Sequence, residues 1–494
     1  MARSSQPGFP LRAAAAALAA AAAALLGGCV VDQAREVSRY RRVLDDHQPK
    51  PEPPPPGDPL SLGLALRLAN ADNEQLASQG ETYLQALIEK NRAFGAFLPT
   101  LSFQPSFTVE QAPKGNAAET TPGAPQANAA AVAASQGGFV QDGQVLRRFE
   151  APLVGNMNFS FRTLPLYDAA KLTVVQQRQL LLDARATILL NVAQTYYQVL
   201  TSTQQVKVLE HSLVLQQARV RDLEGRFHAQ LALALDVSQA KANESATRVQ
   251  LSQARIDARN GRRTLALLIG QPEVENPLIS VTAAPEPARD VSYYVDHALA
   301  TRQDYQAAQI AVQEAHDAVK AAVREYYPSA SLNVAGYLYR QNYADASKWD
   351  GILLANLPIF SAGSIRADVR EAWSHLRQAA LFASYLRREI DQNVRTAYDN
   401  FATSEAELAD LAREVEAASD AYNQSVQQEK NGLAIPLDVL TAQDTLLNSQ
   451  LQYASEAYTR TVFDLDLIRS IGDLDPQTPD RLHWTEVAAA PASN

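Results

Sequence analysis

The sequence predicts a mainly α-helical chain with a few membrane β-strands, built from two internal structural repeats. Three observations lead to this fold class: a phrase that occurs twice, two very long segments without glycine or proline, and segments in which apolar and polar residues alternate. The phrase LALALDVSQA begins at Leu231, and its near copy LAIPLDVLTA begins at Leu433, 202 residues later. Such a duplication indicates that one supersecondary unit occurs twice in the chain.

Further matches extend this repeat along the chain. At the same spacing they are Tyr196 with Tyr398 and Ile269-Gly270 with Ile471-Gly472. Two pairs that contain proline lie upstream at other spacings, namely Leu164-Pro165-Leu166-Tyr167 with Leu357-Pro358-Ile359-Phe360 and Leu98-Pro99 with Tyr327-Pro328. The order of the matches divides the chain into a first repeat, 60–272, a second repeat, 290–475, and a C-terminal tail, 476–494.

Both repeats are expected to follow one plan: a helix of about 30 residues, two short strands, a very long helix and a final helix of about 35 residues. The first helices are expected at Leu64–Phe97 and Tyr293–Tyr326. No glycine or proline occurs from Leu166 to Glu224 or from Ser364 to Asn431. Helices over these segments would be roughly 90–100 Å long. Helices of this length must pack side by side, as they do in coiled coils.

Four segments show the alternation of apolar and polar residues that predicts a half-buried strand. The pattern is clearest at Leu101–Glu110 and around Met157, and weaker at Leu332–Leu338 and Gly351–Leu357. Strands with one apolar and one polar face are typical of membrane barrels, although a soluble β-sandwich has the same alternation. Four strands are too few to close a barrel, and open sheet edges cannot face lipid. Several chains must therefore share one barrel if these strands cross a membrane.

The segment between the first two strands, 111–150, predicts a flexible loop. It is rich in Ala, Gly, Pro, Gln and Asn, whereas the matching loop of the second repeat, about 341–349, is short. Such a composition buries too little apolar surface to fold on its own. We expect this loop outside the cell, with an insertion that has no role as the alternative.

The N-terminal residues, 1–28, predict a cleaved signal peptide. Arg3 and Arg12 accompany an apolar run, Ala13–Leu26, that is too short for a typical membrane helix. The run ends in Leu26-Gly27-Gly28-Cys29, which resembles a bacterial lipobox in which the cysteine is lipidated; an ordinary secretory signal is the alternative. The stretch HQPKPEPPPPGDP, 47–59, predicts a stiff polyproline tether, so 29–59 is assigned to the lipidated Cys29 and its tether.

Composition and motifs argue against several classes of protein. Lys plus Arg number 44 against 54 acidic residues, and such an acidic chain would be repelled by nucleic-acid phosphates. The sequence contains no glycine-rich phosphate loop, nucleophile motif or His pair at metal spacing, so we expect no enzyme activity and no cofactor. A single cysteine allows no intrachain disulfide and no thiolate metal site.

In combination these segments resemble the TolC family of outer-membrane factors, and its lipoprotein branch in particular. The resemblance covers nearly all of the mature chain and lies in the order and duplication of short motifs. They are the lipobox ending at Cys29, Leu98-Pro99 with Tyr327-Pro328, Leu164-Pro165-Leu166-Tyr167 with Leu357-Pro358-Ile359-Phe360, Arg302-Gln303-Asp304-Tyr305, and Asn431-Gly432-Leu433-Ala434 with Leu437-Asp438-Val439.

The resemblance implies a homotrimer, in which three chains with four strands each form a 12-stranded β-barrel in the outer membrane. The helices would continue the barrel as a long periplasmic α-helical barrel. Such a protein is a passive exit duct that docks a periplasmic adaptor and, through it, an inner-membrane pump of the resistance-nodulation-division or ABC type. Residue Val30 after Cys29 implies sorting to outer-membrane lipid.

The resemblance also places the duplicated phrase at the periplasmic tip, where a long helix turns into the next one. Gly432, and Gly225 in the other copy, are expected to allow the turn, and Asp236 and Asp438 to lie in the first turn of the new helices. One interpretation of the aspartates is local, as residues that start a helix. The other is a periplasmic gate, whose candidate residues are Asp438, Thr441 and Asp444. The candidates for adaptor docking are Leu231, Leu233, Asp236, Leu433 and Ile435, with self-packing between hairpins as the alternative for the apolar ones.

The cargo stays open at the level of sequence. We expect efflux of small molecules such as drugs, with the exit duct of a type I protein secretion system as the runner-up. Of the two methionines, only Met157 remains after the signal peptide, which disfavours a methionine relay for metal ions. A coiled-coil scaffold lipoprotein without a pore is the alternative from a different class.

Overall fold

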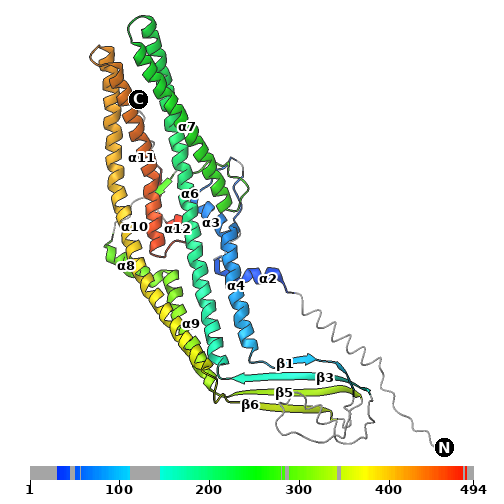
Figure 1. The fold of residues 1–494 in the computed structure, drawn as a ribbon. Coiled ribbons are helices and arrows are strands. Elements are labelled where there is room, and N and C mark those ends of the chain that lie inside the picture. Colours follow the sequence, from blue (N-terminus) through cyan, green and yellow to red (C-terminus); the bar gives the residue numbers. More distant parts are fainter. Residues whose placement is uncertain are drawn as a thin grey trace, which may run out of the picture.

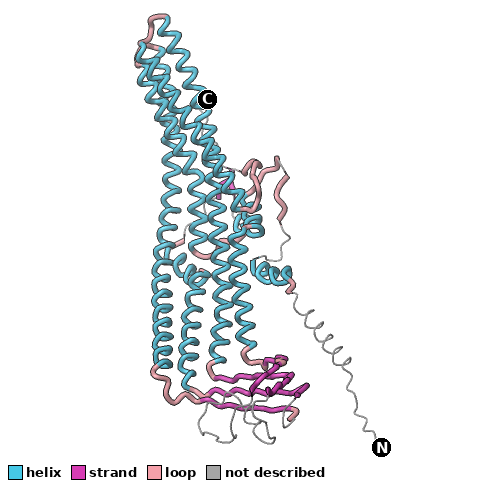
Figure 2. Tube along the Cα trace, turned by 45° about the vertical axis from the view of Figure 1, so that its right-hand side comes forward, coloured by secondary structure: helices cyan, strands magenta, loops and turns pink. Residues whose placement is uncertain are grey.

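A computed structural model describes residues 31–44, 51–55, 57–111, 145–279, 281–283, 289–341, 347–481 and 484–486. Long helices run side by side from a small sheet at one end of the body to two helical hairpins at the other (Figure 1). The sheet lies across the direction of the helices in both views (Figures 1 and 2). The predicted mainly α-helical class with a few strands is therefore confirmed. Within the described residues, none of the helices has both the length and the apolar composition needed to cross a membrane.

The two repeats contain the same kinds of element in the same order, with one strand more in the first, which confirms the duplication. The first repeat comprises α3 (Leu62–Asp72), α4 (Glu74–Gly95), β1 (Thr100–Phe103), β2 (Ser106–Gln111), β3 (Val145–Ser160), α6 (Thr163–His228) and α7 (Ala234–Leu268). The second comprises α8 (Val291–Thr301), α9 (Gln303–Val323), β5 (Ser329–Gln341), β6 (Trp349–Asn356), α10 (Ser364–Lys430) and α11 (Pro436–Ser470), with a short 3-10 turn, Arg324–Tyr326, after α9.

The expectation of one unbroken first helix in each repeat is wrong. Asn73 separates α3 from α4, and Arg302 separates α8 from α9. The Asn73 side chain accepts a hydrogen bond from the Leu76 amide at 2.9 Å and donates one to the Leu268 carbonyl at 2.8 Å. Asparagine at a helix start satisfies an amide that the helix itself leaves free, so the chain restarts the helix there.

The pairing of Leu164-Pro165 with Leu357-Pro358 is also wrong as a structural equivalence. The first pair lies in the opening turn of α6, whereas the second lies in the connection that precedes α10. The long helices have 66 and 67 residues, so the two repeats have long helices of nearly equal length. Leu98-Pro99 and Tyr327-Pro328 do correspond, since β1 and β5 begin directly after the prolines.

The main sheet has the order β1-β3-β5-β6, and β2 also pairs with β3. The expected strand Leu101–Glu110 is therefore two strands, interrupted at Gln104-Pro105 because proline has no amide to donate to a ladder. The predicted loop is also shorter than 111–150, since β3 begins at Val145. Residues 112–144 lie outside the described part.

One face of this sheet carries apolar side chains and the other polar ones. Met157 pairs with Leu332 across β3 and β5, and both are about 40% exposed. In the next register position, Asn333 donates a side-chain hydrogen bond to Asn156 at 2.8 Å. The alternation of the sequence thus places apolar groups on an uncovered face of the chain.

The core lies where α3, α6, α7 and α11 meet. Tyr196 and Tyr197 on α6 are almost fully buried there. The Tyr196 hydroxyl donates to the carbonyl oxygens of Leu60 and Ile279 at 2.8 and 3.0 Å. Burial raises the pKa of this phenol far above its usual value. The duplicated Tyr398 instead packs against Tyr294 in a second core cluster.

Part of the predicted tether, 29–59, is a folded element. Helix α2 (Gln33–Leu44) buries Tyr40 and Leu44 against Leu76 on α4 and Leu181 on α6. Further along, the Asn276 side chain donates to the carbonyl oxygens of Pro55 and Asp58, both at 2.8 Å. The described N-terminal segments therefore lie against the body. The signal peptide and Cys29 lie outside the described residues.

The C-terminal tail, 476–494, also contains folded segments. It carries the short helix α12 (Thr478–Arg481) and β7 (Trp484–Glu486), which pairs antiparallel with β4 (Val281–Ala283). The strand β4 lies in the connection between the two repeats. The tail thus folds back to the middle of the body.

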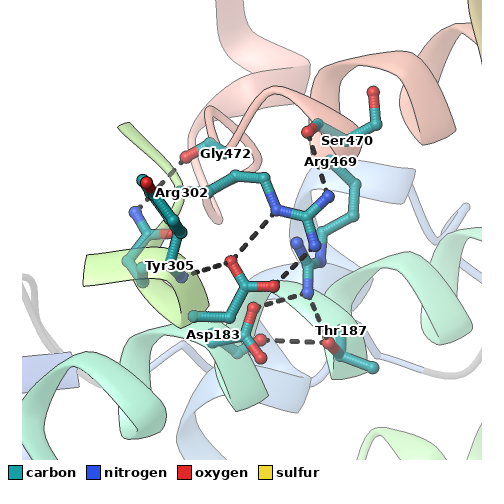
Figure 3. A network of polar contacts seen from close by, with 9 residues as sticks. Asp183, Thr187, Arg302, Tyr305, Arg469, Ser470 and Gly472 are labelled. Carbon is teal, nitrogen blue, oxygen red and sulfur yellow. Dashed lines mark hydrogen bonds and ion pairs between the residues drawn. The ribbon is translucent and has the colours of Figure 1, made fainter. Parts of the chain in front are cut away.

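A polar network joins the two repeats near the middle of the body (Figure 3). Arg469, at the end of α11, contacts Asp183 of α6 at 2.6 Å and Thr187 at 2.9 Å. Arg302 pairs with Asp304 at 2.6 Å and also donates to the Ser470 carbonyl at 3.4 Å. Burial raises the pKa of Asp183, against the opposing charge of Arg469. Burial alone would raise the pKa of Asp304 too, but its contacts with Arg302 lower it.

Helix α2 docks only because residue 80 of α4 is glycine. A Cβ atom at Gly80 would lie 2.3 Å from the buried Tyr40 ring. We expect Gly80→Ala to weaken the docking of α2 by about 1–3 kcal/mol through overpacking. Trypsin should then cleave α2 roughly tenfold faster, because cleavage follows local opening.

Gly225→Ala is the matched control for this substitution. Gly225 lies inside α6, and nothing lies within 4 Å of the position of its Cβ atom. Alanine there should raise local helix stability by about 0.5–1 kcal/mol and leave cleavage of α2 unchanged. Equal cleavage of α2 in the two variants would refute the role of Gly80.

Candidate functional site at the tips of the helical hairpins

The two hairpins end at the same side of the body, far from the sheet (Figure 2). In both, the chain leaves the long helix by the same turn. The Leu231 amide donates to the Arg226 carbonyl at 2.7 Å, and the Leu433 amide donates to the Gln428 carbonyl at 2.8 Å. This six-residue bond is characteristic of a helix that ends in a left-handed residue.

The residue that makes the first turn is Gln230 and not Gly225, which corrects the sequence interpretation. Gln230 has φ 64° and Gly432 has φ 73°, so both occupy the left-handed region. Gly225 stays within α6. A left-handed conformation costs a non-glycine residue about 1–2 kcal/mol, so the first hairpin carries strain that the second avoids.

Asp236 and Asp438 occupy equivalent positions in the first turns of α7 and α11. Each carboxylate accepts a hydrogen bond from the backbone amide three residues earlier, Leu233 or Ile435, at 3.0 Å. The residues at these helix starts are apolar, so only one half of a capping box forms. Pro436 fills the first position of α11, where a missing amide is harmless. The local role expected for both aspartates is therefore present.

The other two gate candidates have different surroundings. Thr441 is exposed on α11, and its hydroxyl donates to the Leu437 carbonyl at 2.9 Å. Asp444 is half-buried and accepts a hydrogen bond from the Asn243 side chain of α7 at 3.1 Å. Burial raises the pKa of this carboxyl. Asp438 and Thr441 are thus both exposed, whereas Asp444 turns toward α7.

The sequence analysis missed the ion pairs that join the two hairpins. Glu429, in the last turn of α10, is buried between Arg219 and Arg226 of α6, at 2.6 and 3.1 Å. Arg226 also contacts Asp222 at 3.0 Å. A glutamate at a helix C-terminus opposes the helix dipole, so it needs cations nearby. A glutamate in the last turn of an expected helix is therefore the feature of the sequence that could have indicated these ion pairs.

The docking candidates form an apolar rim around both tips. Leu231 and Leu433 are each 78% exposed, and Leu233 and Ile435 are more than half exposed. Two further residues of the same phrase, Leu235 and Leu437, belong to this rim and were not among the candidates. Exposed apolar groups gathered at a tip indicate a surface that a partner covers.

The part of the chain that the structure describes contains no group of three or more His, Cys, Asp or Glu side chains placed to hold a metal ion. The polar clusters instead pair acidic with basic residues. The arrangement is suited to joining helices and to meeting a partner at the tips.

Comparisons with known proteins agree with this architecture. Residues 294–473 match the family described as outer membrane efflux protein. The chain is 25% identical over 327 residues to the outer membrane efflux protein BepC of Brucella suis, covering 65% of this chain and 70% of BepC. It is 22% identical over 329 residues to the outer membrane protein TolC of Escherichia coli, covering 62% of this chain and 65% of TolC. The matched region therefore spans about two thirds of these relatives.

A solved structure shows that the fold is shared along most of the chain. The outer membrane protein VceC of Vibrio cholerae superposes with a TM-score of 0.70 at 20% identity. The superposition covers 83% of this chain and 96% of VceC. With the family match over the second repeat and the two relatives, this likeness confirms the resemblance noted in the sequence: residues 294–473 match the outer membrane efflux protein family, and the chain shares the fold of the outer membrane protein VceC.

Proposed function

We propose that three copies of this chain form the outer-membrane exit duct of a tripartite efflux system. The observation that carries the proposal is the sheet. Its exposed face is apolar, and β1 and β6 each pair on one side only among the described strands. A sheet of this kind cannot face lipid alone, because unpaired edge groups are costly there. Strands β1 and β2 pair with β3 one after the other and together fill one strand position, so each sheet has four positions. Three such sheets joined edge to edge would give a closed 12-stranded barrel with the polar face inside.

The helices supply the rest of the duct. Helices α6 and α10 would each reach roughly 100 Å from the membrane, and a ring of such helices continues the barrel through the periplasm. The proposed partners are a periplasmic adaptor at the tips and an inner-membrane pump behind it, of the resistance-nodulation-division or ABC type. The proposed cargo is small molecules, and Cys29 would carry the lipid that anchors the chain.

The experiment that tests this function measures the mass and conductance of the protein extracted from membranes in mild detergent. We expect a particle of three chains that conducts ions when inserted into planar bilayers. A monomer, or an elongated dimer without conductance, would exclude the proposed exit duct. That result would instead support a coiled-coil scaffold lipoprotein.

Within this duct, Asp438 is the proposed gate residue. The carboxylate is exposed at the tip, and three copies would gather negative charge in a narrow wet passage. Thr441 lies one turn further on the exposed side and would line the same passage. Asp444 contributes less in this proposal, since its carboxyl faces Asn243. Such a ring would bind cations and keep the resting tip closed until an adaptor opens it.

Asp438→Asn tests the gate without removing the helix cap, because the amide oxygen can still accept from Ile435. We expect the resting conductance of purified trimers to rise severalfold as the ring loses its charge. Asp236→Asn is the matched control, since its cap has the same 3.0 Å bond. Unchanged conductance in the Asp438 variant, or an equal rise in both variants, would rule out a specific gate.

The apolar rim is the proposed adaptor surface, with Asp236 at its edge. Burying a leucine side chain contributes about 1.5–3 kcal/mol, so a docked partner would gain from each rim residue. Leu433→Ser should therefore weaken adaptor binding by roughly tenfold or more. The readout is drug susceptibility of the source bacterium when the variant replaces its own copy, with trimer content checked in the membrane.

Val214→Ser is the control for this experiment. Val214 is also exposed, at 61%, but it lies 14 residues before the end of α6 at His228, roughly 20 Å along the helix from the tip. We expect normal resistance with this control and increased susceptibility with Leu433→Ser and Leu231→Ser. Full resistance with both rim variants would exclude the tips as the adaptor surface.

A further inference from the structure

The polar network between the repeats consists of Asp183, Arg302, Asp304 and Arg469. The residues at the equivalent positions of the other repeat are all uncharged. Elements before the strands recur after 229 residues, and elements from the hairpins onward recur after 202 residues. Applying these shifts to the network pairs Asp183 with Tyr385 and Arg469 with Leu267. They also pair Arg302 with Asn73 and Asp304 with Gln75. None of the four equivalent residues carries a charge.

In each repeat, the break in the first helix lies beside the end of the final helix, and this place is called the joint. The first joint lies around Asn73 and Leu268, and the second lies around Arg302 and Ser470. Both are built in the same way. Asn73 donates to the Leu268 carbonyl at the end of α7, as Arg302 donates to the Ser470 carbonyl at the end of α11. Gly270 and Gly472 follow these helices, both with positive φ. A Cβ atom at either glycine would crowd the backbone of the linker beside Asn73 or Arg302. The first joint therefore has the same backbone arrangement as the second.

What differs is the long helix that covers each joint. In the second repeat, α6 of the same chain covers it and contributes Asp183. The counterpart of α6 is α10, which packs against α8, α9 and α11. Figure 1 shows α10 at one edge of the body and α4 and α7 at the other. Among the described helices of the chain, none therefore covers the first joint as α6 covers the second.

We infer that α10 of a second copy covers this joint, with Tyr385 packed against Leu267 of its neighbour. Both side chains are uncovered in the single chain, at 53% and 72% exposure. Leu381 and Phe382, one turn before Tyr385 on α10, are also more than half exposed. The contact between copies is thus apolar at the level where the contact within the chain is ionic. This inference rests on the proposed trimer and specifies one of its contacts.

The difference between the two joints gives the assembly its specificity. If α10 of another copy displaced α6, Arg469 would meet the phenol of Tyr385 in place of the Asp183 carboxylate, whereas Arg302 would keep its pairing with Asp304. The partly buried guanidinium group of Arg469 would then lose its anion, which costs more than an apolar mismatch. Each joint therefore rejects the wrong helix by its charge pattern.

A double cysteine variant tests the contact. Cys29 is the only native cysteine, so Leu267→Cys with Tyr385→Cys adds two thiols at exposed positions. Trimers in membranes are treated with a mild oxidant or with a short bismaleimide. We expect bands of two and three linked chains on a denaturing gel, and no such bands with either single variant. Asp183→Cys with Arg469→Cys is the control, which should link only within one chain.

The outcome separates this inference from the function on which it rests. If mass measurements show trimers but the double variant gives no linked chains with either reagent, the inference is wrong and the duct stands. If no trimers form in the unmodified protein, the proposed function fails first. A second variant adds a positive test: Leu267→Arg should lower the temperature at which trimers dissociate, and adding Tyr385→Asp should restore it.

Discussion

Two helices of 66 and 67 residues must stay packed over their whole length, and the rest of the structure depends on this constraint. A long helix gains most of its stability from its packed face. Each of these two therefore needs different neighbours along its course. Near the sheet α6 contacts α4 and α9, and toward the tips it contacts α7 and α11. The change of neighbours occurs at the joints where α3 and α8 restart as α4 and α9.

The two joints share one backbone arrangement but differ in the side chains around it. Both use a linker residue that bonds the end of the final helix, and both need a glycine with positive φ beside it. The second joint adds two ion pairs, Arg302 with Asp304 and Arg469 with Asp183, and only the second of them involves the covering helix α6. The first joint has uncharged residues at the equivalent positions, with the exposed Leu267 in place of Arg469. A duplicated unit can in this way distinguish a contact within the chain from one between copies.

Much of the fold could be predicted because its signals are local. Helix periodicity, the absence of glycine and proline, and the alternation of strands depend on residues close in sequence. The break at Asn73 was missed because one asparagine is tolerated inside many helices, and only its bond with Leu268 requires the restart. The docking of α2 was missed for a similar reason, since Tyr40 needs the gap at Gly80, which lies in another helix.

By itself, the sequence determined the duplication, because the two copies can be matched residue by residue. It also determined the lengths of the hairpins and the helix-starting role of Asp236 and Asp438, because these rest on residues a few positions apart. Only the tertiary structure decided which charges meet. Asp183 and Arg469 are 286 residues apart, and Arg219 reaches Glu429 across 210 residues. No periodic pattern encodes such a contact, since it depends on how the helices are placed side by side in three dimensions.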